Sequence, residues 1–401
     1  MVYNHLGPEG NYIERFGPYF TARHSSPWGK AVNFDGPYSD EVRRFFCDNA
    51  IMWLRDYHFD CLRIDAIHSI VDTSAVHILE QLAVEVEMLE AEVGRRLTLI
   101  AESDLNDPRV IRPREVGGYG IDAQWSDDFH HALHTVLTGE REGYYRDFGS
   151  LADLAKALTN VFVYDGQYSA FRRRSHGRPL ETLNGHQFLG YIQNHDQVGN
   201  RARGERLGHL VGLGRLKIAS AMVFISPFIP LLFQGEEWGA STPFQYFTDH
   251  QDKELGKAVH NGRHKEFSAF GWKFEDIPDP QALETFQRSR LNWEERDRRV
   301  HRSMLEWYRS LISLRRSTPS LLDGRVDRVE ADFDQEAQWF RVIRGPMTVL
   351  CNLADEVQRV PIGRDRPKKI LLSSNPTNRT GPDYGELQPE SVVILGETTD
   401  G

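Results

Sequence analysis

The sequence predicts an α/β fold: a TIM (β/α)8-type barrel that lacks its first strands, followed by a small antiparallel β-sandwich. Short apolar runs alternate with amphipathic helical segments, as they do in parallel sheets. Three of these runs end in a carboxylate, at Asp65, Glu102 and Asp196. A polar residue just past a buried strand lies at its C-terminal tip, which is the end of a parallel barrel where chemistry takes place.

The elements of the predicted barrel follow one another in a regular order. Residues 2–5 look like the tail of a strand, and a segment rich in Gly, Pro and aromatic residues follows them up to residue 38. Ser39 is the expected N-cap of the first helix, and Gly94 is expected to end the second. The predicted strands are 59–64, 97–101, 121–125, 188–193 and 229–233, and the predicted helices are 39–57, 73–93, 127–137, 150–158, 210–223 and 301–315.

The pattern changes after Gly324, where short strand candidates are separated by Gly, Pro, Asp and Asn. These strands are 339–343, 348–353, 369–372 and 391–395. We therefore predict a partial barrel over residues 1–320, which begins at about its third strand, and an all-β domain over 321–401. Five strands and a fragment of a sixth precede the boundary, whereas a complete barrel has eight.

The composition narrows the classes of function. The chain has 401 residues, 40% of them hydrophobic and 26% charged, and a net charge of −10, which is typical of a globular enzyme. The acidic balance argues against nucleic acid or a membrane as partner. The longest apolar stretch, 221–233, is too short to span a bilayer, and no signal peptide is visible, so a cytoplasmic protein is expected.

The three cysteines predict neither a disulfide framework nor a zinc site. Cys61 lies in an apolar run and is expected to be a small core residue. Asp104, Asn106 and Asp107 lie close together but lack the pattern of a calcium loop, so no metal is predicted. No glycine-rich phosphate loop or dinucleotide fingerprint is present, and no cofactor is expected.

Four segments, each at the end of a predicted strand, resemble the characteristic segments of the α-amylase superfamily of glycoside hydrolases. They are residues 2–5, 61–68, 100–103 and 192–197. Within the superfamily the chain is most similar to the malto-oligosyltrehalose trehalohydrolases, over residues 3–12, 17–20, 125–134 and 233–240. The resemblance covers almost the whole chain. It implies that an N-terminal β domain, two barrel strands and the aspartate that opens the first segment are missing.

The resemblance implies a retaining mechanism with Asp65 as nucleophile and Glu102 as general acid and base. Arg63 lies two residues before Asp65, so both side chains point to the same side of the strand, and the cation should keep the carboxylate ionised. Glu102 must stay protonated near neutral pH, and the nearby carboxylates should raise its pKa. Asp196 is implied to hold sugar hydroxyls and to favour the distorted ring of the transition state.

Further residues are expected to bind the sugars. They are His5, Arg63, His68, Asp127, Asp128, His130, His131, His195 and Gln197. Those of the 127–131 cluster also suit an ordinary helix start, because carboxylates are favourable in a first helical turn. Five aromatic residues, Trp125, Trp238, Phe244, Tyr246 and Phe247, are candidates either for stacking on sugar faces or for the core.

The expected activity is cleavage of the α-1,4 bond next to the terminal trehalose of maltooligosyl trehalose. Two alternatives stay open: a glucan branching or debranching enzyme of the same superfamily, and an inactive α-glucan-binding fragment. The second arises because missing strands would leave sheet edges and an apolar barrel interior open to water. The 401-residue chain alone is therefore expected to be insoluble or inactive.

Overall fold

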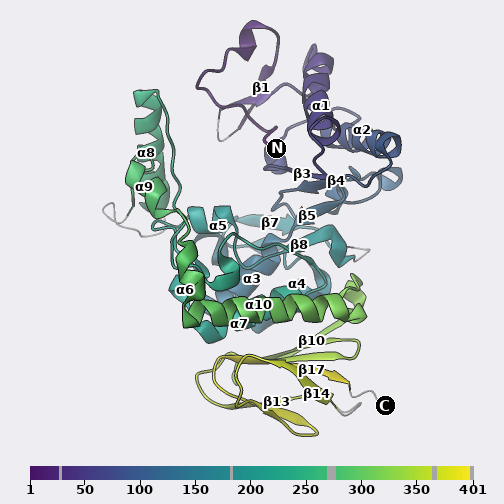
Figure 1. Cartoon of the computed structure of the whole chain (residues 1–401). Coiled ribbons are helices and arrows are strands. Elements are labelled where there is room, and N and C mark those ends of the chain that lie inside the picture. The colour runs from purple at the N-terminus through teal and green to yellow at the C-terminus, as the bar shows by residue number, and fades with distance from the viewer. Residues whose placement is uncertain (27–28, 181–183, 269–276, 364–367, 398–401) are drawn as a thin grey trace.

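The computed structural model describes residues 1–26, 29–180, 184–268, 277–363 and 368–397 (Figure 1). Among these residues, no helix is both long enough and apolar enough to cross a membrane. The α-helices are α1 Ser39–Arg55, α2 Ile78–Val93, α3 Asp127–Thr138, α4 Leu151–Asn160, α5 His195–Gly199, α6 Leu207–Leu210, α7 Leu213–Ile225, α8 Lys253–Ser268, α9 Leu283–Arg288 and α10 Arg299–Ser317.

A parallel sheet of five strands positions the carboxylates. Its order is β3-β4-β5-β8-β9, and all four neighbouring pairs are parallel. The strands are β3 Cys61–Ile64, β4 Thr98–Ala101, β5 Ala123–Trp125, β8 Phe188–Gly190 and β9 Ile229–Pro230. All five predicted barrel strands are thus present, each shorter than predicted, and the sheet is open between β3 and β9.

The prediction that residues 2–5 form the end of a strand is wrong. No regular strand forms there, although the chain does run beside β3, where the backbone N–H of Asp65 donates to the carbonyl of Met1 over 2.9 Å. Cys61 is also exposed rather than in the core. It lies on β3, an edge strand whose side chains alternate between the packed helices and the open side of the sheet.

Helix boundaries follow local hydrogen bonds more than hydrophobic spacing. The predicted N-cap at Ser39 is wrong, because Tyr38 precedes α1 in a left-handed conformation and no side chain caps the helix. Helix α2 begins five residues later than predicted, since the His77 side chain accepts the Leu79 N–H and Asp72 accepts the Ile78 N–H. Gly94 ends α2 at a φ of 67°, as predicted.

The C-terminal part is a β-sandwich, as predicted. One sheet has the order β10-β11-β12-β17-β14 and the other β13-β16-β15, both antiparallel. Leu350, Val360, Leu387 and Val393 are among the apolar residues buried between them. The strands are β10 Val329–Asp334, β11 Trp339–Arg344, β12 Met347–Asn352, β13 Gln358–Pro361, β14 Lys368–Ser373, β15 Arg379–Thr380, β16 Tyr384–Leu387 and β17 Ser391–Glu397.

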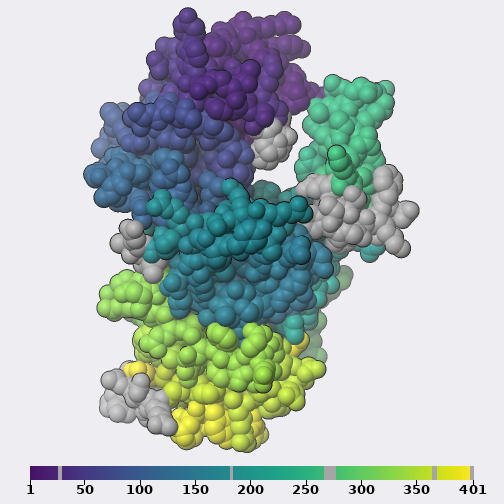
Figure 2. Space-filling view, turned by 180° about the vertical axis from the view of Figure 1, so that it is seen from behind, coloured from purple at the N-terminus to yellow at the C-terminus, as the bar shows by residue number. Residues whose placement is uncertain are grey.

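Three excursions lie around the C-terminal end of the parallel sheet. Two are antiparallel hairpins, β1 Phe20–Ser26 with β2 Gly29–Val32 and β6 Asp165–Ser169 with β7 Arg174–Gly177. The third contains α8 and α9 and projects from the body beyond α5 and α6 (Figure 1). We call residues 240–268 and 277–290 the arm. Figure 2 shows an opening between the arm and the N-terminal part of the chain.

Candidate active site

One guanidinium joins the three carboxylates at the C-terminal ends of the strands. Arg63 on β3 contacts Asp65 at 2.5 Å, also contacts Glu102, and lies 3.9 Å from Asp196. The guanidinium stacks over the Trp125 ring, with 4.3 Å between the Cζ atom and the ring centroid. The parallel register of β3 and β4 places Asp65 and Glu102 side by side at the same edge. The sequence prediction that these groups converge is therefore met by the geometry.

Asp65 is held ionised by its neighbours. Partial burial acts to raise its pKa, but the Asn4 amide and the Arg63 guanidinium outweigh burial and hold the pKa below its ordinary value. Asn4 is buried, and its Nδ2 donates both to the Asp65 carboxylate over 2.9 Å and to the Asp65 carbonyl over 2.8 Å. His5 follows directly, and its Nδ1 contacts the Asn4 side-chain oxygen.

The pKa of Glu102 is shifted in the opposite direction to that of Asp65. Burial raises its pKa to about 7 despite the opposing charge of Arg63, and Asp196 adds to the rise. Its carboxylate accepts the backbone N–H of Ala66 over 2.7 Å. Ala66 presents that N–H from a left-handed conformation, at φ 38°, which is strained for a residue with a β-carbon. The turn after Asp65 thus orients Glu102.

Asp196 lies in the first turn of α5. The Asn194 side chain caps that helix and accepts the N–H groups of Asp196 and Gln197 over 2.8 and 3.1 Å. His195 is half exposed, and its Nε2 lies 3.5 Å from the Asp196 carboxylate. Burial, with Arg63 nearby, lowers the pKa of His195, so the imidazole is neutral at pH 7.

A cavity of about 230 Å³ opens beside Glu102 and Asp196. Its lining residues are Glu102, Asp104, Trp125, Asp127, His131, Tyr144, Phe171, Arg172, Asp196, Gln197 and Asn200. Asp127 is half-buried, and burial raises its pKa to about 7 although the Tyr191 hydroxyl donates to it. His131 stacks on Tyr144 with 5.0 Å between the ring centroids. The predicted residues Asp127, His131 and Gln197 therefore meet at one cavity.

Two members of the predicted 127–131 cluster lie in the packing instead. Asp128 is buried and accepts the Asn106 amide and the backbone N–H groups of Val163 and Tyr164, over 2.7 to 2.9 Å. His130 is buried, and its Nε2 lies 3.0 Å from the Tyr145 hydroxyl. Successive residues of α3 point in different directions, so the four predicted residues of this cluster cannot all face the same cavity.

His68 reaches the cavity through Asp104, at 3.8 Å from that carboxylate. Asp104 also accepts from Arg172 on the β6–β7 hairpin over 2.8 Å. The other two polar residues of the 104–107 segment are also engaged, because Asp107 pairs with Arg109 and the Asn106 amide donates to Asp128. Within the described residues, no group of three or more His, Cys, Asp or Glu side chains is arranged to hold a metal ion. The absence of a metal stays a prediction.

Sequence reasoning missed several residues of this site. Asn4 lies in the segment 2–5, directly before His5, and that segment could have indicated it. Four of them reach the cavity from a short 3₁₀ helix, a hairpin and the end of α5, none of which directly follows a strand of the parallel sheet: Tyr144, Phe171, Arg172 and Asn200. No local pattern indicates such residues, because their placement depends on how distant segments fold over the sheet.

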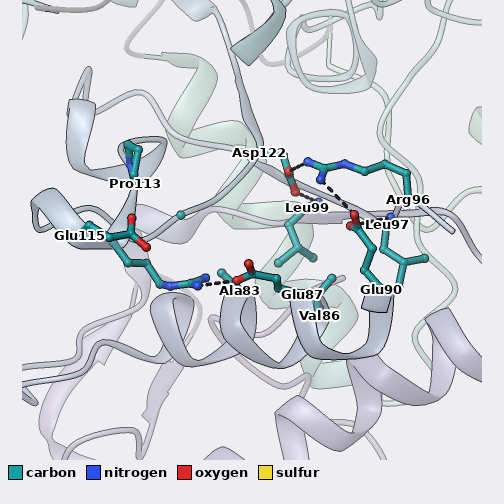
Figure 3. A pocket seen from close by; sticks show the side chains of 12 residues that line it. Ala83, Val86, Glu87, Glu90, Arg96, Leu97, Leu99, Pro113, Glu115 and Asp122 are labelled. Carbon is teal, nitrogen blue, oxygen red and sulfur yellow. Dashed lines mark hydrogen bonds and ion pairs between the residues drawn. The ribbon is translucent and has the colours of Figure 1, made fainter. Parts of the chain in front are cut away.

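A second cavity, of about 240 Å³, lies at the opposite end of the strands, between α2 and the segment 113–122 (Figure 3). Arg96 bridges Glu90 and Asp122 there, over 3.1 and 2.5 Å. Arg114 pairs with Glu87 across the mouth. These charged groups satisfy one another at the amino ends of β4 and β5, so the ion pairs account for the polar lining of this cavity.

Comparison with known proteins places the chain in a family. Residues 324–394 match the model of a domain of unknown function, DUF3459. A malto-oligosyltrehalose trehalohydrolase of Mycobacterium tuberculosis is 49% identical over 396 residues, which are 98% of this chain and 67% of the relative. The chain belongs to the malto-oligosyltrehalose trehalohydrolase family.

Other relatives agree with this membership. The trehalohydrolase of Rhizobium sp. (strain M-11) is 50% identical over 98% of this chain and 66% of the relative. The chain thus spans about two thirds of the length of the curated trehalohydrolases that it matches. A Salmonella typhimurium protein, solved as a candidate alpha amylase, is 35% identical with a TM-score of 0.86, over 99% of this chain and 67% of that protein. A glucan branching enzyme of Mycobacterium bovis is a distant match, 27% identical over 59% of this chain and 32% of the relative.

Proposed function

We propose that the protein is a cytoplasmic retaining glycoside hydrolase that cleaves the α-1,4-glucosidic bond adjacent to the terminal trehalose of maltooligosyl trehalose. The products are trehalose and a malto-oligosaccharide. Family membership supports the substrate. The observation that carries the chemistry is the Arg63 cluster, in which one carboxylate is held ionised while its neighbour has a pKa of about 7. That division suits a nucleophile and a general acid.

In the first step the Asp65 carboxylate attacks the anomeric carbon, while Glu102 gives its proton to the glycosidic oxygen. The carbon–oxygen bond to trehalose breaks as the bond to Asp65 forms. In the second step Glu102, now ionised, takes a proton from water. The water oxygen attacks the anomeric carbon and Asp65 leaves, which restores both carboxyl groups.

The remaining residues bind and orient the sugars. Asp196, His5 and His195 surround the sugar ring whose glycosidic bond is cleaved, and hydrogen bonds to the hydroxyls of that ring strengthen in the transition state. Asp127, His131 and Gln197 receive the trehalose side in the cavity, with His68 acting through Asp104. Asp128 and His130 support this wall from within the packing.

The test is the release of free trehalose by the native protein from maltooligosyl trehalose, with the malto-oligosaccharide of equal length as the control substrate. Trehalose from the first and no hydrolysis of the second supports the proposal. New α-1,6 bonds, or cleavage of existing ones, would identify a branching or debranching enzyme instead. Binding of the oligosaccharide without any product would identify the inactive glucan-binding fragment, the alternative that the open edges of β3 and β9 favour.

A further inference from the structure

A series of aromatic rings leads away from the catalytic end of the sheet along the arm. The centroids of Phe233 and Phe244 are 5.2 Å apart, those of Phe244 and Phe247 6.3 Å, and those of Phe247 and Phe286 5.2 Å. Tyr246 lies between two of these residues in the sequence. We call these five residues the aromatic track. It begins three residues after β9 and ends on α9.

The track is continuous with the candidate active site. The Phe244 ring lies against Gly199, the last residue of the helix that carries Asp196, and its nearest atoms are 3.8 Å from where a β-carbon would stand. Arg263 of α8 stacks on the Tyr246 ring, 4.5 Å from the centroid. The same guanidinium donates to the Gly199 carbonyl over 2.7 Å and to the Asn200 side chain over 3.0 Å. Asn200 lines the cavity.

The rings are too exposed to be only a small core of the arm. Tyr246 is 41% exposed, Phe247 38% and Phe286 42%. The ring pairs are edge to face, with interplanar angles of 70° and 71° for the two that include Phe247. Such packing fixes the rings and leaves ring faces open, and exposed aromatic surface of this kind marks a binding surface.

The arm is also fixed at its outer end. The Glu9 carboxylate accepts the backbone N–H groups of Gln251 and Asp252 over 2.7 and 2.9 Å and contacts His250 at 3.1 Å. The arm is thus attached to the N-terminal segment just after His5 and to α5 through Arg263. A surface held at both ends binds a ligand with less loss of conformational entropy than a mobile one.

We propose that the aromatic track binds the malto-oligosaccharide portion of the substrate, a linear α-1,4-glucan chain. It would hold the glucose units that lie beyond the sugar ring at the scissile bond, on the side away from trehalose. The proposal rests on the proposed function and extends it to substrate length. Glucose rings present flat C–H faces that stack on aromatic rings, and they are uncharged, which suits a ligand for a chain of net charge −10. The arm is held beside His5 and against α5, the two parts of the site assigned to the ring next to the scissile bond, and this position selects a sugar chain over a second copy of the chain or another protein.

Binding of maltotriose and maltoheptaose is measured by calorimetry in the Asp65→Asn background, so that no turnover occurs. Tyr246→Ala and Phe247→Ala should each weaken maltoheptaose binding about tenfold, which corresponds to about 1.4 kcal/mol, because each removes one ring face on which a glucose unit stacks. The loss should be smaller for maltotriose. Tyr384→Ala is the matched control, because Tyr384 is 38% exposed and is stacked by Arg359 at 4.9 Å, but lies in the C-terminal sandwich.

Two conservative variants separate stacking from folding. Tyr246→Phe keeps the ring and should bind as the parent does, whereas Phe247→Leu keeps apolar volume without a flat face and should lose affinity for maltoheptaose. Equal losses for both sugars, or unchanged binding in all track variants, would overturn the proposal. So would a dimer in sedimentation that the variants dissociate without changing sugar binding. Failure to release trehalose would remove the proposed function but leave a length-dependent binding result intact.

Discussion

Each end of the parallel sheet carries an arginine between two carboxylates, and the two clusters behave differently. At the C-terminal ends, Arg63 contacts Asp65 and Glu102, and its side chain is 23% exposed. At the amino ends, Arg96 contacts Glu90 and Asp122, and its side chain is 70% exposed (Figure 3). Residue types alone therefore do not distinguish a reactive site from a surface ion pair.

The two clusters differ in how deeply their carboxylates are buried and in the additional side chains, Asp196 and Asn4, that contact the carboxylates beside Arg63. Glu102 is largely removed from water and has Asp196 as a neighbour, so its pKa rises to about 7 although a cation touches it. Asn4 adds a hydrogen bond to Asp65 only, which keeps that carboxylate ionised. Water screens the Arg96 pairs, and exposed pairs of this kind contribute little to stability.

The largest expected contrast is between Asp65→Asn and Asp122→Asn. The first should lower kcat by more than about a thousandfold, because an amide cannot form the glycosyl intermediate and each tenfold loss corresponds to about 1.36 kcal/mol. Asp122→Asn should leave kcat close to that of the parent, as the amide oxygen can still accept the Leu99 N–H. Trehalose release measures both, and similar rates for the two variants would remove Asp65 from its role.

Glu102→Gln and Glu90→Gln give the next contrast. Loss of the general acid should slow the natural substrate by roughly 10²–10⁴-fold. A substrate whose leaving group needs no proton should be much less affected in its first step. Glu90→Gln should change neither rate. If Glu102→Gln slows both substrates equally, Glu102 is not the acid.

The pH dependence of kcat/KM tests the two carboxylates separately. Activity should fall as pH rises through about 7, because Glu102 then loses the proton that it must donate. Asn4→Leu removes a donor to the ionised form of Asp65, so the pKa of Asp65 rises and the acidic limb moves to higher pH. A rate loss of roughly 10–100-fold is expected for a lost hydrogen bond to a charged group. An unmoved acidic limb would contradict this role of Asn4.

The smallest effect is expected at Arg96. Arg96→Gln should lower the free energy of unfolding by at most about 1 kcal/mol, the range of exposed ion pairs, and should leave turnover unchanged. Urea denaturation measures the first and trehalose release the second. A loss of turnover without a loss of stability would mean that the two ends of the sheet are coupled.

Much of the fold could be predicted from periodicity. The five parallel strands carry short continuous apolar runs and the helices between them carry apolar residues at three-and-four spacing, and a sequence displays both patterns directly. Among the C-terminal strands, β10, β13, β15 and β16 were missed because they are rich in polar residues, and β13 also pairs with the distant β16. The N-terminus of α1 was misjudged because Tyr38 adopts a left-handed turn that no side-chain preference indicates.

The residues of the site likewise divide into those that the sequence predicts and those whose position depends on tertiary packing. The three carboxylates and Arg63 were found because they lie on or after predicted strands, and the C-terminal ends of parallel strands meet at one edge of the sheet. Asp128 was expected at the cavity but is satisfied inside by Asn106, Val163 and Tyr164. Its neighbour Asp127 does line the cavity, so the direction of each side chain around α3 decided the outcome. The sequence alone does not contain that rotation of the helix against the sheet.

The shared guanidinium has a consequence for charge balance. With Glu102 protonated, the single positive charge of Arg63 and the negative charges of Asp65 and Asp196 leave one net negative charge. Under the proposed mechanism, esterification neutralises Asp65 while Glu102 becomes ionised, so the cluster again carries one net negative charge. Each half-reaction moves a charge from one side of Arg63 to the other without changing the total. The rate of the chemical step should therefore be nearly independent of ionic strength, because no ion has to enter or leave.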